Sequence, residues 1–130
     1  MIVITTPTGL IGHQVLDKLL DRGEPLRVIA REASALPPYV REHVDVVEGS
    51  HGAVAVVDEA FAGADAVFWL TPPDPQAPSV EAAFVGFTRP VAEAFKRHGV
   101  KRVVGVSALG RVPRGRRTQA TSLAHWRWTT

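Results

Sequence analysis

The feature that most constrains this chain is a buried strand that runs directly into a glycine-containing turn. Residues 1–5 read Met-Ile-Val-Ile-Thr, and residues 6–12 read Thr-Pro-Thr-Gly-Leu-Ile-Gly before a helical pattern begins. In α/β domains this order holds the pyrophosphate of a dinucleotide, because glycine allows close backbone approach and the amides of the helix's first turn point at the anion. Thr6 stands where the first glycine of that motif usually stands, which leaves a tight turn without a ligand as the alternative.

Strands and helices alternate along the rest of the chain. Further apolar runs predict strands at 26–30, 44–48, 66–70 and 103–107. Amphipathic spacing predicts helices at 14–21, 54–62 and 79–98. The alternation favours an α/β fold of the Rossmann type, a doubly wound parallel sheet of five strands in the order 3-2-1-4-5.

Prolines and glycines mark interruptions in this pattern. Residues 31–42 contain Pro37 and Pro38, and we expect a loop there with at most a short helix. Ser79 is predicted to cap the last helix, Pro90 to kink it and Gly99 to end it.

Composition bounds the class of protein. A chain of 130 residues, 45% hydrophobic and 22% charged, is long enough for one core. The absence of cysteine excludes disulfides and thiolate metal sites and is compatible with a cytoplasmic location. The five histidines have no metal-ligand spacing, so we expect no metal site and predict that each histidine lies at the surface. A strand that begins at residue 2 leaves no room for a secretory signal, and apolar runs such as 66–70 are too short to span a membrane.

Charge divides the chain into two parts. Residues 1–102 hold all 13 acidic residues against 10 of the 15 lysines and arginines, a net charge of −3. Residues 103–130 hold the other five basic residues, all arginine, and no acid, a net charge of +5. Nucleic-acid binding would rest on this basic tail alone, and the mildly acidic balance of the remainder argues against it.

The candidate site lies at the carboxyl ends of the strands. In a sheet of this order the ligand crevice opens above the ends of strands one and four, where the strand order reverses. The candidates for binding a cofactor are Thr6, Thr8, Gly9, Leu10, Ile11, Gly12, Arg31, Ser50, Leu70, Thr71, Pro72 and Ser107. Thr71 is placed under a nicotinamide ribose, with a plain loop residue before two prolines as the alternative. No catalytic residue is assigned.

Arg31 is the candidate that bears on cofactor choice. An acid at the end of strand two accepts hydrogen bonds from the ribose 2′-hydroxyl of NAD, whereas an arginine there suits the 2′-phosphate of NADP. The strand ends Ala30-Arg31-Glu32, so NADP is favoured and Glu32 keeps NAD possible. The alternative is a surface arginine that pairs with Glu32.

Four segments together resemble the NmrA-like group of atypical short-chain dehydrogenase/reductases. They are residues 2–12, 28–31, 64–73 and 103–108. The resemblance extends from residue 1 to about residue 110 and implies an NADP-preferring Rossmann domain. Members of the group include quinone- or azo-reducing enzymes and non-catalytic redox sensors that bind the dinucleotide and contact a regulator. The resemblance therefore implies an NAD(P)H-dependent oxidoreductase, with an NAD(P)-sensing transcriptional regulator acting through a protein partner as the alternative.

The chain departs from that group in three ways. The usual Gly-Asp after strand three, whose acid sits near the adenine, is here Gly49-Ser50. There is no Tyr-x-x-x-Lys, the pair that protonates substrate oxygen in ordinary short-chain reductases, because the only tyrosine is Tyr39. The C-terminal part of the family fold is missing, so we expect little activity and an unpaired fifth strand through which the chain self-associates.

The last residues carry no helix or strand period. We divide the chain into a Rossmann domain at 1–110 and a basic tail at 111–130. A frameshifted reading of an ancestral gene is the interpretation we favour for the tail, because a shifted frame can encode Leu-Ala-Met-Asp-Asp across residues 125–130, as NmrA-like proteins continue. A genuine disordered basic tail is the alternative, and the gene's DNA on both sides of residue 117 distinguishes the two.

Overall fold

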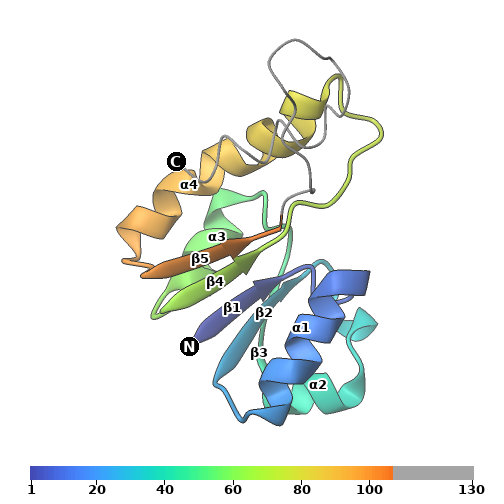
Figure 1. Cartoon of the computed structure of the whole chain (residues 1–130), viewed down its shortest axis with the longest axis vertical. Coiled ribbons are helices and arrows are strands. Elements are labelled where there is room, and N and C mark those ends of the chain that lie inside the picture. The colour runs from blue at the N-terminus through green and yellow to red at the C-terminus, as the bar shows by residue number, and fades with distance from the viewer. Residues whose placement is uncertain (107–130) are drawn as a thin grey trace, which may run out of the picture.

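Short apolar runs build a central sheet of five parallel strands in the computed structural model, which describes residues 1–106. The strand order is β3-β2-β1-β4-β5, as predicted (Figure 1). The strands are β1 (Ile2–Thr5), β2 (Leu26–Ala30), β3 (Asp45–Glu48), β4 (Ala66–Trp69) and β5 (Arg102–Gly105). Ser107 and the expected tail at 111–130 lie outside the described residues.

Helices cover both faces of the sheet (Figure 1). The α-helices are α1 (Leu10–Asp21), α2 (Pro38–His43), α3 (Val54–Phe61) and α4 (Phe87–Arg97). A 3-10 turn, η1 (Ala33–Ala35), precedes α2, and a π-helical turn, η2 (Ala82–Gly86), precedes α4. The short helix α2 is what the prolines at 37 and 38 predicted for this segment. None of the helices within residues 1–106 is long and apolar enough to cross a membrane.

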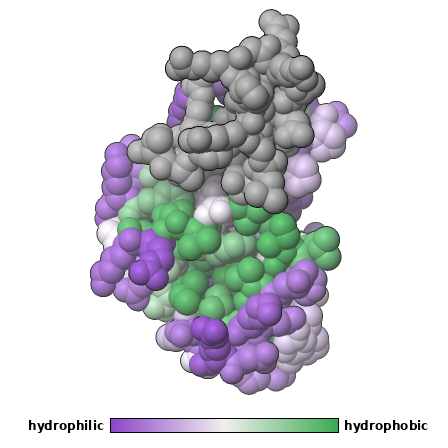
Figure 2. Space-filling model, viewed as in Figure 1, coloured by the Kyte–Doolittle hydropathy of each residue, from purple (hydrophilic) through white to green (hydrophobic). Residues whose placement is uncertain are grey.

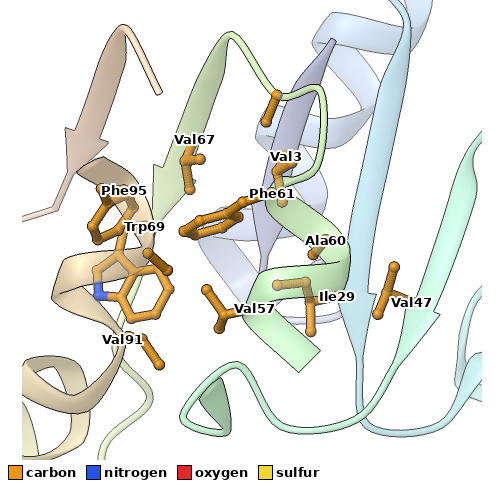
Figure 3. Close-up of a cluster of buried hydrophobic side chains, with 12 residues drawn as sticks. Val3, Ile29, Val47, Val57, Ala60, Phe61, Val67, Trp69, Val91 and Phe95 are labelled. Carbon is orange, nitrogen blue, oxygen red and sulfur yellow. The ribbon is translucent and has the colours of Figure 1, made fainter. Parts of the chain in front are cut away.

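Successive residues of each inner strand enter different cores, because side chains alternate across a sheet. Val3 of β1 and Val67 of β4 pack with Phe61 of α3 in one buried cluster (Figure 3). Their neighbours Ile4 and Phe68 pack on the opposite face, in a second cluster that includes Leu16 of α1. The sheet is therefore buried on both sides, as a parallel sheet requires.

The first helix begins earlier than the predicted range of 14–21. It starts at Leu10, directly after Gly9, which has extended backbone and occupies the N-cap position. Leu10 and Ile11 are 77% and 42% exposed, so the first turn has no buried apolar face by which periodicity could reveal it. The early start places the helix N-terminus at the carboxyl end of β1, where an anion would bind.

The last helix contains a π-helical turn, and this turn ends one helical turn before Pro90. Ser79 caps the start as predicted, since its Oγ accepts the amide of Ala82 at 3.0 Å. Pro90 lies inside α4 and has no amide to donate to the carbonyl of Gly86. The π-helical turn η2 ends at that same glycine, so the disturbance expected from the proline takes the form of a wider turn.

Strand β5 is the outermost strand of the sheet within residues 1–106. It pairs with β4 alone among the described residues, and all four of its residues are exposed. Val104 pairs in register with Phe68 and is 50% exposed, on the face of the sheet that α1 covers only in part. Figure 2 shows hydrophobic side chains gathered on this face. An exposed apolar edge strand is a template for pairing with another chain.

We predict that the chain self-associates through β5. Val104→Lys should shift it toward monomer, because a charged side chain on an edge strand opposes edge-to-edge pairing. Light scattering over a concentration series measures this. Val54→Lys is the matched control, since Val54 is 40% exposed on α3 and the change in charge is the same. A wild-type chain that stays a monodisperse monomer at high concentration contradicts the prediction.

Candidate functional site

The turn between β1 and α1 is closed by its own backbone. The amide of Gly9 donates to the carbonyl oxygen of Thr6 at 3.0 Å. Thr6 has φ of 50°, in the left-handed region that favours glycine, and a β-branched residue there is strained by about 1–3 kcal/mol. The structure thus keeps the backbone shape of the motif's first glycine, although threonine occupies the position.

Gly12 allows α1 to start against this turn. A Cβ at residue 12 would lie 1.9 Å from the carbonyl oxygen of Thr6, a distance that no side chain can adopt. The first backbone bond of the helix runs from the amide of His13 to the carbonyl of Gly9. The amides of Leu10, Ile11 and Gly12 therefore precede the helical ladder and remain for an anion.

The side chain of Thr6 also has an unpaired polar atom, which is a second indication that a ligand binds beside this turn. Its Oγ1 is the one enclosed side-chain nitrogen or oxygen within residues 1–106 that has no hydrogen-bond partner. Enclosed polar atoms are normally paired, because burying them without a partner costs free energy. The strained backbone and this atom belong to the same residue, at the carboxyl end of β1.

The carboxyl end of β4 is tied to β1 and to the loop after β3. Thr5 Oγ1 accepts the amide of Leu70 at 2.9 Å and lies 3.1 Å from the carbonyl oxygen of Phe68, to which it donates. Nε2 of His51 lies 2.9 Å from the carbonyl oxygen of Leu70. Both backbone groups of Leu70 are therefore held by side chains, which fixes the point at which the chain turns into Thr71 and Pro72.

Thr71 is buried and joins a network of hydroxyl groups. Its Oγ1 lies 3.3 Å from Oγ1 of Thr88, which donates to the carbonyl oxygen of Phe84 at 2.8 Å and accepts from Nε1 of Trp69 at 3.3 Å. Because the one hydroxyl proton of Thr88 is already donated to the carbonyl oxygen of Phe84, Thr71 must be the donor in its hydrogen bond with Thr88. The oxygen of Thr71 thus stays available as an acceptor at the end of β4.

A pocket of about 370 Å³ opens at the carboxyl ends of the strands, where the sequence predicted it. It is lined by Thr6, Pro7, Thr8, Gly9, Ile29, Ala30, Arg31, Glu32, Ala35, Gly49, His51 and Pro72. Five of the predicted site residues thus meet in one cavity: Thr6, Thr8, Gly9, Arg31 and Pro72.

The other predicted residues that the structure describes are not among those that line the pocket. Leu10, Ile11 and Gly12 form the first turn of α1, and Leu70 and Thr71 follow β4. Ser50 is exposed, and its Oγ accepts the amide of Gly52 at 3.2 Å. Its hydroxyl oxygen is therefore engaged within the loop. Ser107 lies outside the described residues.

Arg31 is exposed at the end of β2, and no carboxylate of residues 1–106 lies within ion-pair distance of it. The pairing of Arg31 with Glu32, considered from the sequence, is not seen there. Glu48 holds the loop beside it, because its Oε2 accepts the amide of Ala33 at 2.8 Å.

His51 was predicted to lie at the surface, and that prediction is wrong. The residue is only 6% exposed, and its ring packs edge-on against Trp69 and Phe87 at centroid distances of 5.2 and 4.9 Å. Burial lowers the pKa of His51 below its usual value, the hydrogen bond to Leu70 opposes this, and the charge of Arg31 lowers it further. Its aromatic neighbours are distant in the sequence, so no local pattern pointed to the residue.

Tyr39 lies on α2 and is not among the residues that line the pocket. Its hydroxyl donates to Oδ1 of Asp17 at 3.0 Å, and this bond raises the pKa of Tyr39. A tyrosine that delivers a proton in catalysis needs a lowered pKa. The one tyrosine of the chain, on α2, is thus bound to Asp17 and does not line this pocket.

Comparison with known proteins identifies the family. Residues 7–127 match the NAD(P)H-binding family, which is nearly the whole chain. The chain belongs to this family. The Rossmann fold and the NmrA-like resemblance predicted from the sequence are thereby confirmed, and the Gly9–Gly12 turn, the free amides of α1 and the pocket beside Arg31 fit a nicotinamide dinucleotide.

Three relatives illustrate the likeness. A (4-alkanoyl-5-oxo-2,5-dihydrofuran-3-yl)methyl phosphate reductase from Streptomyces griseus is 38% identical over 84% of this chain and 35% of its own length. An NADPH-dependent quinone oxidoreductase from Escherichia coli, solved with NADPH, matches 84% of this chain and 37% of its own, with a TM-score of 0.69 and 23% identity. A short-chain dehydrogenase/reductase superfamily protein from Agrobacterium tumefaciens, solved with NAD, matches 83% and 32%, with a TM-score of 0.67 and 27% identity. The chain thus spans about a third of the length of these proteins.

We predict that Gly12→Ala destabilises the chain and weakens dinucleotide binding. The added methyl group would force the start of α1 away from Thr6, at a cost of about 3 kcal/mol in the free energy of unfolding, the upper range for an added group in a packed site. Urea denaturation and cofactor titration measure the two effects. Gly86→Ala is the matched control, because a Cβ there would meet no atom closer than 4.0 Å. Equal stability of the two variants would contradict the prediction.

Proposed function

We propose that this chain binds NADP(H) in preference to NAD(H), with Arg31 holding the 2′-phosphate. The supporting observation is that Arg31, the exposed residue directly after β2, lines the same pocket as Gly9 and has no carboxylate partner within residues 1–106. A guanidinium in this place matches the geometry of a phosphate. Glu32 lines the pocket too and would suit a ribose 2′-hydroxyl, which keeps NAD as the alternative.

We propose further that the chain derives from an NAD(P)H-dependent oxidoreductase of the quinone- or azo-reducing kind. Two of the relatives described above are reductases by name. A bound nicotinamide supplies the hydride, and the residues described here bind and orient it. Because this chain spans only 35% of the Streptomyces reductase, we expect little turnover from it alone. A cytoplasmic location stays a prediction.

A non-catalytic NAD(P)-sensing regulator that acts through a protein partner is the second candidate. The observation in its favour is that Tyr39 is bound to Asp17 and its pKa is raised, so residues 1–106 offer the pocket no tyrosine suited to proton delivery. A sensor needs only dinucleotide binding and a surface for its partner. The exposed face beside β5 is such a surface.

Arg31→Ala tests the choice of cofactor. A charge-assisted hydrogen bond contributes about 1.5–3 kcal/mol, so the variant should bind NADPH roughly ten- to a hundredfold more weakly. Affinity for NADH should hardly change, because NADH has no 2′-phosphate. Titration followed by cofactor fluorescence measures both constants.

The matched control for this test is Arg41→Ala, which removes an exposed arginine from the last turn of α2. It should leave the affinity for both cofactors unchanged. If Arg31→Ala weakens NADPH and NADH equally, Arg31 has a structural role and the proposed NADP preference fails.

A quinone panel separates the enzyme from the sensor. Reduction of a quinone that depends on added NADPH, and that is lost in Gly12→Ala, supports the enzyme. Tight NADPH binding with no reduction of any quinone above the rate without protein supports the sensor. The measurement is the absorbance of NADPH against time, with the same protein sample used for the binding titration.

A further inference from the structure

His51 brings an imidazole into the dinucleotide pocket at a place where the sequence pattern suggested no function. It lies in the loop between β3 and α3, beside Gly49, and lines the pocket together with Arg31 and Pro72. Trp69 and Phe87 pack edge-on against its ring, which fixes the ring's position. The imidazole is thus a rigid part of the cavity wall.

The hydrogen bond to Leu70 decides which ring nitrogen carries the proton. A backbone carbonyl oxygen can only accept, so Nε2, at 2.9 Å from it, must donate. Burial keeps the ring neutral by lowering its pKa, and Nδ1 is therefore an acceptor with a free lone pair.

No donor within residues 1–106 reaches this second nitrogen. The hydrogen bond to Leu70 is the one that His51 forms there, and Thr6 Oγ1 is the one enclosed and unpaired side-chain polar atom in that part of the chain. Nδ1 of His51 is consequently not sealed off. It presents an acceptor to a ligand.

The chemistry of the ligand indicates which group Nδ1 meets. The pyrophosphate lies at the N-terminus of α1 and the adenosine ribose near Arg31, so the adenine bonded to that ribose extends toward the loop that holds Gly49 and His51. The ring nitrogens of adenine that remain free are all acceptors. Its 6-amino group alone can donate to an acceptor in the wall.

We propose that Nδ1 of His51 accepts a hydrogen bond from the 6-amino group of adenine and thereby selects adenine over 6-oxopurine dinucleotides. The inference rests on the proposed binding of an adenine dinucleotide in this pocket. Ser50 is less suited to this task, because its oxygen already accepts the amide of Gly52. His51 differs from Ser50 in that its ring is buried and fixed by Trp69 and Phe87.

The test compares NADPH with its reduced hypoxanthine analogue, in which a 6-oxo group replaces the 6-amino group. Both carry the same fluorescent dihydronicotinamide, so one titration method serves for both. The full-length wild-type chain should bind NADPH about tenfold more tightly, because the 6-oxo group sets an acceptor against an acceptor. Equal affinity of the wild-type chain for the two cofactors overturns the proposal without any substitution.

Two variants assign the preference to His51. His51→Leu keeps an apolar side chain between Trp69 and Phe87 and removes both ring nitrogens, so the affinity ratio should fall to about one. His51→Asn retains an acceptor oxygen and should restore most of the preference. A purely structural role would weaken both cofactors alike and leave the ratio unchanged, and a preserved ratio in His51→Leu overturns the proposal.

The outcomes also separate this proposal from the one on which it rests. A wild-type chain that binds neither cofactor overturns the proposed NADP(H) binding. It then also overturns the proposed recognition of adenine by His51. A chain that binds both cofactors, and loses NADPH affinity in Arg31→Ala but shows no amino preference, keeps NADP(H) binding and overturns only the role of His51.

Discussion

The site depends on one close approach between a helix and the turn that precedes it. The carbonyl oxygen of Thr6 accepts the amide of Gly9 and would lie 1.9 Å from a Cβ at residue 12. Because Gly12 has none, α1 begins directly after the end of β1, with its free amides at the pocket. The positive φ of Thr6 costs conformational free energy. The packing of the rest of α1, including the buried Leu16, offsets that cost.

A second constraint fixes the opposite wall of the pocket. Leu70 is held through its amide by Thr5 and through its carbonyl by His51, so β1, β4 and the loop after β3 meet at one residue. A loop that starts with Thr71 and Pro72 would otherwise be free to move. The hydrogen bond from His51 to the carbonyl oxygen of Leu70 also sets the tautomer of His51. One contact therefore both holds the loop in place and determines that Nδ1 is an acceptor.

The sequence predicted the sheet because its inner strands are continuous apolar runs, as in residues 2–4 and 66–70, and a strand whose side chains enter two cores must be apolar on both faces. It could not reveal the first turn of α1, whose Leu10 is exposed although apolar. It also missed His51, because its aromatic neighbours and the carbonyl of Leu70 come from distant segments. Glycine and strand-end positions mark the pocket's location, whereas its polar lining depends on tertiary contacts that have no local period.

Dinucleotide binding can be tested in this chain by itself, because the whole pocket lies within the described residues. The pocket is formed by the turn after β1, the end of β2 and the loops after β3 and β4, all within residues 1–106. The edge of β5 and the face around Val104 stay exposed in that part of the chain. Arg31 and His51 are both proposed to contact the adenosine half of the dinucleotide, so affinity measurements can test their roles whether or not a substrate is ever reduced.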